Sequence, residues 1–167
     1  MELLSENLKK TMDHWLTKFP VDQKRSAVVA ALLAAQQENE GWLPESVMQA
    51  VAEYLQLSTI EVVEVATFYD MFELKPIGKH KIGLCTNVSC KLRGSDDIAD
   101  ALEKRLGVKL GETTADNQFT LRETECLGAC ANAPMCQHND QDYHEDLTVD
   151  KMMALIDKWQ QEGRASE

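Results

Sequence analysis

The chain has 167 residues, 28 of them acidic and 17 basic, so its formal net charge at neutral pH is −11. This balance disfavours binding to nucleic acids or to anionic membrane surfaces, because both need clustered Lys and Arg side chains. The hydrophobic fraction of 44% is ordinary for a globular protein with an apolar core. No apolar run approaches the ~20 residues of a membrane-spanning helix, and the N-terminal residues lack the pattern of a secretory signal.

The sequence pattern of the first 75 positions predicts a helical bundle. The segment Ala27–Ala35 is apolar almost all round, so the helix that contains it is expected to be the central one. Ser58 and Glu61 have the spacing of a capping box, which favours a helix start at that point. Apolar periodicity and the positions of Pro and Gly predict helices over 5–18, 22–39, 44–55 and 58–69.

The second part of the chain alternates between strand and helix patterns. We expect Ser95 to cap a helix over 96–106, with Gly107 ending it, and Thr148 to cap a last helix that carries Trp159. Strands are predicted over 80–85, 119–123, 135–138 and 141–144. This order indicates a small α/β sandwich. The Pro76–Gly78 segment is the expected hinge, which places domain boundaries at 1–76 and 77–167.

All five cysteines lie in the second part, and four of them form two close pairs. Four residues separate Cys85 from Cys90, three separate Cys126 from Cys130, and 35 lie between the pairs. Each pair follows a predicted strand, so the loops could turn four thiolates toward one point. A [2Fe–2S] cluster needs four thiolates, two for each iron. The spacing also permits a structural zinc ion or unliganded thiols, although short C-x2-C pairs dominate zinc sites.

The remaining candidate residues favour structural roles. Cys136 is interpreted as a buried thiol in a strand. Together with His138 it forms half of a Rieske-like pattern, but the other half is missing, so a histidine-ligated cluster is not expected. His14, His80 and His144 are interpreted as surface or structural polar side chains. No glycine-rich phosphate loop occurs, and no site for a nicotinamide, a flavin or an acyl substrate is expected.

These residues together resemble one family closely: the small iron–sulfur subunit, of the E or 24 kDa type, of bacterial NADH:quinone oxidoreductase (respiratory complex I). The resemblance extends from about Phe19 to Lys158. The combination of the cysteine spacing with the Ala-Thr-Phe-Tyr and Cys-Leu-Gly-Ala-Cys sequences is highly specific. The segments that carry it are 40–44, 65–72, 85–90, 125–134 and 143–148.

The resemblance implies an α+β fold, in which an N-terminal helical bundle, 1–76, precedes a thioredoxin-like [2Fe–2S] ferredoxin domain, 77–167. It implies that the bundle packs on the large partner subunit of the complex that binds FMN and NADH. It also implies a cis peptide bond between Ala133 and Pro134, where thioredoxin-like folds often place one. The cluster ligands that it implies, as cofactor-binding and metal residues, are Cys85, Cys90, Cys126 and Cys130.

The function implied by the resemblance is electron transfer within NADH:quinone oxidoreductase. The cluster would accept one electron from FMN on the large flavoprotein of the F type, which also binds NADH and a [4Fe–4S] cluster. This chain would contain no catalytic residue and would not oxidise NADH when isolated. It would lie in the bacterial cytoplasm, attached to the inner membrane through the rest of the peripheral arm. The alternatives are the equivalent subunit of an NAD-linked hydrogenase or formate dehydrogenase, or a zinc-stabilised structural adaptor.

Overall fold

The computed structural model describes residues 3–164, and the chain divides into two compact units, Met1–Pro76 and Ile77–Glu167. Each unit has its own apolar core. Among the described residues, no helix combines the length and the apolar character that crossing a membrane requires.

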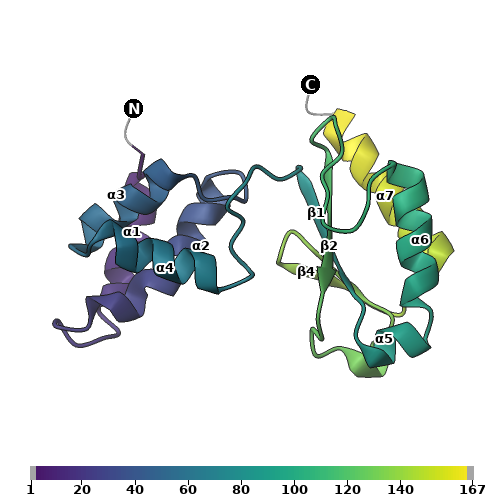
Figure 1. Cartoon of the computed structure of the whole chain (residues 1–167), viewed down its shortest axis with the longest axis horizontal. Coiled ribbons are helices and arrows are strands. Elements are labelled where there is room, and N and C mark those ends of the chain that lie inside the picture. The colour runs from purple at the N-terminus through teal and green to yellow at the C-terminus, as the bar shows by residue number, and fades with distance from the viewer. Residues whose placement is uncertain (1–2, 165–167) are drawn as a thin grey trace. The chain divides into compact units, whose positions relative to one another are not determined.

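The first unit is a bundle of four α-helices (Figure 1). The apolar helix α2 contacts each of the other three, as its sequence predicted. Its Ala31, Leu32 and Ala35 side chains are buried against them, because an apolar surface on every side of a helix has to be covered on every side. The four helices are α1 (Glu6–Leu16), α2 (Val28–Glu38), α3 (Glu45–Leu55) and α4 (Thr59–Phe68).

Local capping positions the ends of these helices. The expected capping box is present at α4, where the Glu61 carboxylate accepts hydrogen bonds from the Ser58 backbone N–H at 3.1 Å and its hydroxyl at 2.7 Å. The predicted start of α2 at residue 22 is wrong, because Lys24–Ala27 form a 3₁₀ helix instead. Gln23, which precedes this turn, makes no side-chain cap hydrogen bond within the described part of the chain, so nothing in its side chain favours an α-helical start.

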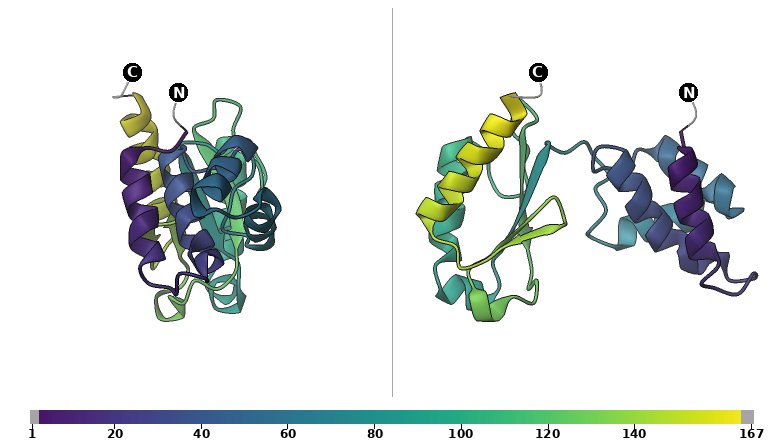
Figure 2. Two further views of the ribbon diagram at one scale, coloured as in Figure 1. Left: turned by 90° about the vertical axis from the view of Figure 1, so that its left-hand side faces the viewer. Right: turned by 180° about the vertical axis from the view of Figure 1, so that it is seen from behind.

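The second unit is built on a four-stranded sheet with the order β2-β1-β3-β4. The first two strands are parallel, and the pairs β1–β3 and β3–β4 are antiparallel. A parallel pair needs a crossover, which the helices α5 (Val88–Leu92) and α6 (Ser95–Leu106) provide. Helix α6 and α7 (Val149–Arg164) lie on the same face of the sheet (Figures 1 and 2). The strands are β1 (His80–Cys85), β2 (Phe119–Thr124), β3 (Cys136–His138) and β4 (Asp142–His144).

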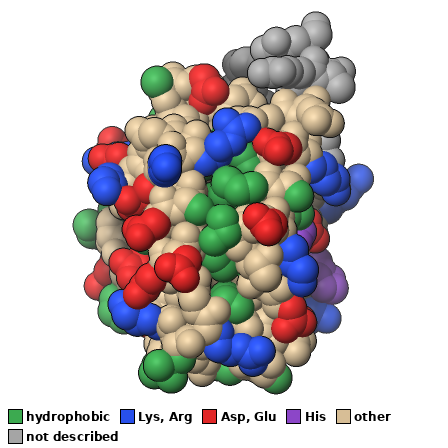
Figure 3. Space-filling view, turned by 90° about the vertical axis from the view of Figure 1, so that its right-hand side faces the viewer, with side chains coloured by type: hydrophobic (Ala, Val, Ile, Leu, Met, Phe, Trp, Pro, Cys, Tyr) green, Lys and Arg blue, Asp and Glu red, His purple; other side chains and the backbone are tan. Residues whose placement is uncertain are grey.

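The outer surface of α6 and α7 carries charges of both signs in a mixed pattern (Figure 3). One ion pair joins the two helices, between the Arg105 guanidinium and the Asp157 carboxylate at 2.9 Å. Another joins Glu103 to Lys109 at 2.7 Å, just beyond the end of α6. This face therefore has the character of an ordinary solvated surface.

Two sequence expectations about the crossover need correction. Ser95 does not cap α6 but is its first residue, and Gly94 is the N-cap, with a φ of 98° that suits glycine. The Ser95 side chain is fully buried, and its hydroxyl has no hydrogen-bond partner among residues 3–164. The short helix α5, which carries Cys90, was expected to be a loop. Its five residues are too few for apolar periodicity to reveal it.

Gly78, just before β1, gives a first testable prediction. A Cβ at this position would lie 2.7 Å from backbone atoms of Phe119, and the Gly78 N–H donates to the Thr120 hydroxyl at 2.6 Å. We expect Gly78→Ala to lower the free energy of unfolding by about 1–3 kcal/mol in urea denaturation, since backbone cannot move aside cheaply. Gly83→Ala is the matched control, because the one close contact of its Cβ, at 2.7 Å, would be with the rotatable Thr124 hydroxyl, and the nearest backbone atom would be 3.8 Å away. Equal stability losses in both variants would contradict this account.

Candidate metal centre

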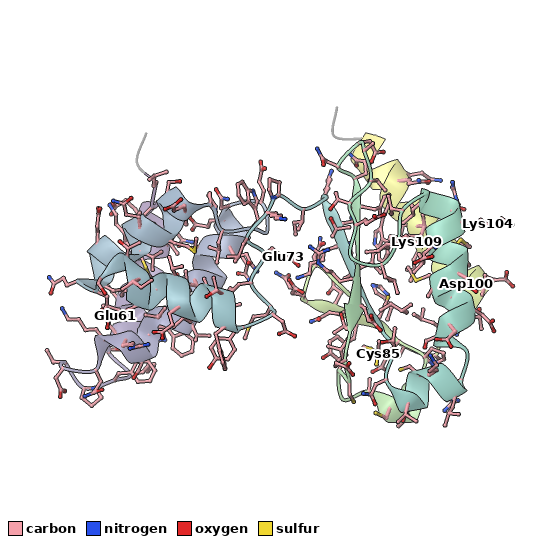
Figure 4. The ribbon with its side chains drawn as sticks, in the orientation of Figure 1. Glu61, Glu73, Cys85, Asp100, Lys104 and Lys109 are labelled. Carbon is pink, nitrogen blue, oxygen red and sulfur yellow. The ribbon has the colours of Figure 1, made fainter. Side chains whose placement is uncertain are left out.

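The sheet places the two cysteine pairs at the same edge. Cys85 is the last residue of β1, and Cys126 follows β2 by two residues. The two strands are parallel neighbours, with Cys85 aligned with Thr124, so their carboxyl ends meet. Figure 4 labels Cys85 at the end of the sheet where α5 lies. The expectation that the pairs lie at the ends of two strands is confirmed, and the structure adds that these strands are neighbours.

The thiols of each pair face one another. The Sγ atoms of Cys126 and Cys130 are 3.4 Å apart, and both residues are exposed. Cys85 and Cys90 are buried, and their side chains are hydrogen-bonded to each other. Cys90 also interacts electrostatically with Cys130, which connects the two pairs. The structure therefore places the thiols of each pair together, and it places both pairs at the same edge of the sheet.

The surroundings shift the pKa values of the Cys90 and Cys126 thiols in opposite directions. Burial, followed by the hydrogen bond with Cys85, raises the pKa of Cys90 to about 11. A backbone hydrogen bond from Gly128, followed by one from the Cys130 side chain, lowers the pKa of Cys126. Gly128 has a φ of 83°, a conformation that glycine adopts without strain. This glycine therefore lets the loop turn its N–H toward the Cys126 sulfur.

Hydrogen bonds between distant residues join the two cysteine loops. The Thr86 hydroxyl donates to the Glu123 carboxylate at 2.8 Å, and the Asn87 amide donates to the Glu125 carboxylate at 2.8 Å. These contacts support the site without supplying ligands. Sequence reasoning missed them, because about forty residues separate the partners and no local pattern marks such a pair.

The segment after Cys130 packs against the buried cysteine pair. The expected cis peptide bond between Ala133 and Pro134 is confirmed. Met135, the next residue, is buried in a small apolar cluster with Ala133, Cys85 and Cys90. Its carbonyl accepts a hydrogen bond from the Cys85 N–H at 3.2 Å. One flank of the thiols is therefore shielded from water, while Cys126 and Cys130 form the exposed flank.

The spacing of the exposed pair suits two thiolate ligands on one metal ion. A tetrahedral ion with metal–sulfur bonds of about 2.3 Å separates two of its sulfur ligands by about 3.8 Å, close to the 3.4 Å between Cys126 and Cys130. Within residues 3–164, no three His, Cys, Asp or Glu side chains are grouped closely enough to hold one ion. Two connected pairs suit a cluster in which each iron takes two thiolates.

Cys136 belongs to a different environment. It is fully buried in the core between the sheet and α7, with its Sγ 4.0 Å from the Met152 sulfur. Burial raises the pKa of its thiol to about 12. The interpretation of Cys136 as a buried thiol in a strand is therefore confirmed.

This difference in exposure predicts a difference in alkylation. In cluster-free protein at about pH 8, iodoacetamide should modify Cys126 and Cys130 within minutes and leave Cys136 unmodified, because only an exposed thiolate reacts. Peptide mass spectrometry at increasing reaction times measures the three rates. Denaturant is the control, since unfolding should make the rates similar. Modification of Cys136 in folded protein as fast as Cys126 would contradict the buried assignment.

The histidines contribute nothing to the thiol group. His14 is an exposed residue of α1, whereas His80 is buried and His138 and His144 are half-buried. The last three are gathered around Trp159 of α7. The interpretation of His14, His80 and His144 as surface or structural polar residues agrees with these positions.

Comparisons with known proteins agree with these features. A family model described as thioredoxin-like [2Fe-2S] ferredoxin matches residues 12–160. A Rickettsia conorii protein, named as the E subunit of NADH-quinone oxidoreductase, is 56% identical over 145 residues, 87% of this chain and 86% of that protein. The Rickettsia prowazekii protein of the same name is 49% identical over 159 residues, 95% of this chain and 88% of that protein.

A solved structure shares the fold. The NAD+-reducing [NiFe]-hydrogenase in its H2-reduced state superposes with a TM-score of 0.69 at 25% identity over 77% of this chain. The match spans only 22% of the hydrogenase chain. The expected thioredoxin-like fold is confirmed. The family match and the near full-length relatives show that this chain belongs to the thioredoxin-like [2Fe-2S] ferredoxin family and, within it, to the E-type subunits of NADH-quinone oxidoreductase.

Proposed function

We propose that the chain is the electron-transfer subunit of an NADH–quinone oxidoreductase and holds one [2Fe–2S] cluster on Cys85, Cys90, Cys126 and Cys130. The observation that carries the proposal is the pairing of these thiols at one edge of the β1–β2 sheet. Two relatives that are 56% and 49% identical to most of this chain are named as the E subunit of that enzyme. When bound, the cluster supplies a centre that accepts and returns a single electron.

The residues around the thiols provide the conditions for such a centre. The Gly128 N–H is directed to Cys126, where a backbone donor offsets negative charge on sulfur. Met135 and Ala133 exclude water from the flank of Cys85 and Cys90. The exposed flank of Cys126 and Cys130 is the side from which a redox partner approaches, because electron transfer needs a short path through protein. In this proposal NADH binds to the partner flavoprotein and not to this chain.

The partner in this proposal is the FMN- and NADH-binding flavoprotein of the enzyme, and the first unit docks on it or on the neighbouring peripheral arm. Phe68 is 79% exposed and Ile60 is 71% exposed, both on α4, which is unusual for large apolar side chains. The second unit carries the cluster. Five free cysteines fit a reducing compartment, which supports a position on the cytoplasmic side of the membrane.

The equivalent subunit of an NAD-linked hydrogenase is a second candidate. The superposition on an NAD+-reducing [NiFe]-hydrogenase favours it, although that chain is several times longer than the matched part. Affinity purification of the chain from its native host separates the two. Co-purification of quinone-reductase subunits supports the main proposal, and co-purification of a nickel-containing subunit supports the second.

The cluster is tested by spectroscopy of anaerobically purified protein. We expect two irons per chain, visible charge-transfer bands that bleach with dithionite, and a rhombic S = ½ EPR signal after reduction. NADH should cause no bleaching of the isolated chain, and bleaching should appear when the flavoprotein is added. A colourless protein with one zinc ion per chain would refute the proposal and support a structural adaptor.

A further inference from the structure

The loop that carries the exposed cysteine pair is held by residues at and just after β4. On β4, the Tyr143 hydroxyl donates a hydrogen bond to the Leu127 carbonyl at 3.0 Å. Farther along the loop, the Asn132 side-chain amide donates to the Glu145 carboxylate at 2.7 Å, and the Asp146 N–H donates to the Asn132 carbonyl at 2.7 Å. The loop is therefore tied to the β4 region at both of its ends.

The strand register places the Tyr143 side chain where it reaches the loop. Tyr143 pairs with Gln137 of β3 and comes one position before His144, which contacts Trp159 of α7. Successive side chains of a strand point to opposite faces, so Tyr143 lies on the face of the sheet away from α7. Tyr143 is 47% exposed, so its contact with Leu127 is a feature of the surface and not of the core.

The carbonyl that Tyr143 holds belongs to the same peptide group as the Gly128 N–H. Among residues 3–164, the one cis peptide bond is Ala133–Pro134, so the Leu127–Gly128 bond is trans. The C=O and N–H of a trans peptide lie in one plane and point in opposite directions. The Gly128 N–H donates to the Cys126 thiol. Fixing the Leu127 carbonyl on one side therefore directs this N–H toward sulfur on the other.

An N–H directed at this sulfur affects the electron that the site accepts. Reduction adds one negative charge to the centre, and hydrogen bonds to its sulfurs are among the features that set its potential. A donor stabilises the reduced state more than the oxidised state, because a hydrogen bond to a more negative acceptor is stronger. Holding the Gly128 N–H on Cys126 therefore raises the reduction potential.

We propose that Tyr143 is a positioning residue of the electron-transfer site: its hydroxyl fixes the Leu127–Gly128 peptide, keeps the peptide N–H on the Cys126 sulfur, and so raises the reduction potential. The inference rests on the proposed function, since it assigns Tyr143 a role toward the cluster on the four cysteines. Tyr143 acts through the backbone and supplies no ligand itself. One exposed hydrogen bond contributes little to folding, so its removal separates the potential from the stability of the unit.

A redox titration of the full-length holoprotein, followed by EPR, tests the effect on the potential. Tyr143→Phe should shift the equilibrium about threefold toward the oxidised state, as expected for the weakening of one hydrogen bond. For one electron this is about 30 mV toward lower potential. Tyr54→Phe is the matched control, because it removes a hydroxyl that donates at 2.8 Å to the Asp13 carboxylate in the first unit. An unchanged or raised potential in Tyr143→Phe, or an equal shift in Tyr54→Phe, would overturn the proposal.

A second measurement follows the Leu127–Gly128 peptide without the cluster. In full-length, cluster-free protein with reduced thiols, NMR records the exchange of the Gly128 amide hydrogen with water. Tyr143→Phe should speed this exchange about threefold, since the released peptide turns its N–H away from sulfur more often, and Tyr54→Phe should not. An unchanged exchange rate in Tyr143→Phe overturns the positioning role, whatever metal the chain holds. A chain that loads no two-iron cluster refutes the proposed function, and the effect on the potential with it.

Discussion

Replacing Cys126 with alanine should abolish the cluster. The substitution leaves one iron with a single protein thiolate, and no other described side chain near Cys130 replaces the lost sulfur, since Cys136 lies in a separate core. We expect at least about a tenfold loss of iron and of visible absorbance, since even supporting residues around a metal are worth 10–100-fold. The measurement is iron content and absorbance after identical anaerobic reconstitution. Alanine substitution of Cys85, Cys90 or Cys130 should cause the same loss of iron and absorbance.

Cys136→Ala is the matched control for this series. It removes a sulfur from the same unit, six residues from Cys130, but from the core beneath α7. It should lower the stability of the unit while leaving the iron content and the EPR signal unchanged. Loss of the cluster in Cys136→Ala with native circular dichroism, or its retention in Cys126→Ala, would refute the ligand assignment.

Leu32→Ala should strongly destabilise the helical bundle. Leu32 is fully buried in α2, the helix that contacts all three others, so truncation leaves a cavity that the bundle cannot easily fill. Comparable substitutions cost about 2–5 kcal/mol of unfolding free energy. Urea denaturation followed by tryptophan fluorescence measures the change. Hydrogen exchange assigns it to the first unit.

The matched control is Leu3→Ala, because Leu3 is 53% exposed and should cost no more than about 0.5 kcal/mol. The visible spectrum of the cluster should survive in Leu32→Ala, since the thiols belong to a unit with a core of its own. Equal stabilities of the two leucine variants would show that α2 is not the centre of the bundle.

Local chemistry explains which parts of the fold the sequence predicts. The capping box at Ser58 and Glu61 and the apolar circumference of α2 depend on residues three to eight positions apart, so a sequence pattern contains the whole interaction. The two cysteines of each pair are also only a few positions apart, so the sequence pattern reveals each pair. Errors occur where the turn is too short to have a period, as at Lys24–Ala27 and Val88–Leu92. Ser95 was predicted to be the N-cap of α6. The N-cap is Gly94 instead, because its left-handed conformation makes the turn into the helix.

The sequence by itself determined the two cysteine pairs, the helical character of the first part and the strand–helix alternation of the second. Only the tertiary structure decided which residues meet. It separates Cys136 from Cys130, six positions earlier, because β3 carries Cys136 into the core under α7. It also joins His80 to His138, 58 positions apart, through the antiparallel register of β1 and β3. Strand pairing acts between distant segments, so no local pattern contains it.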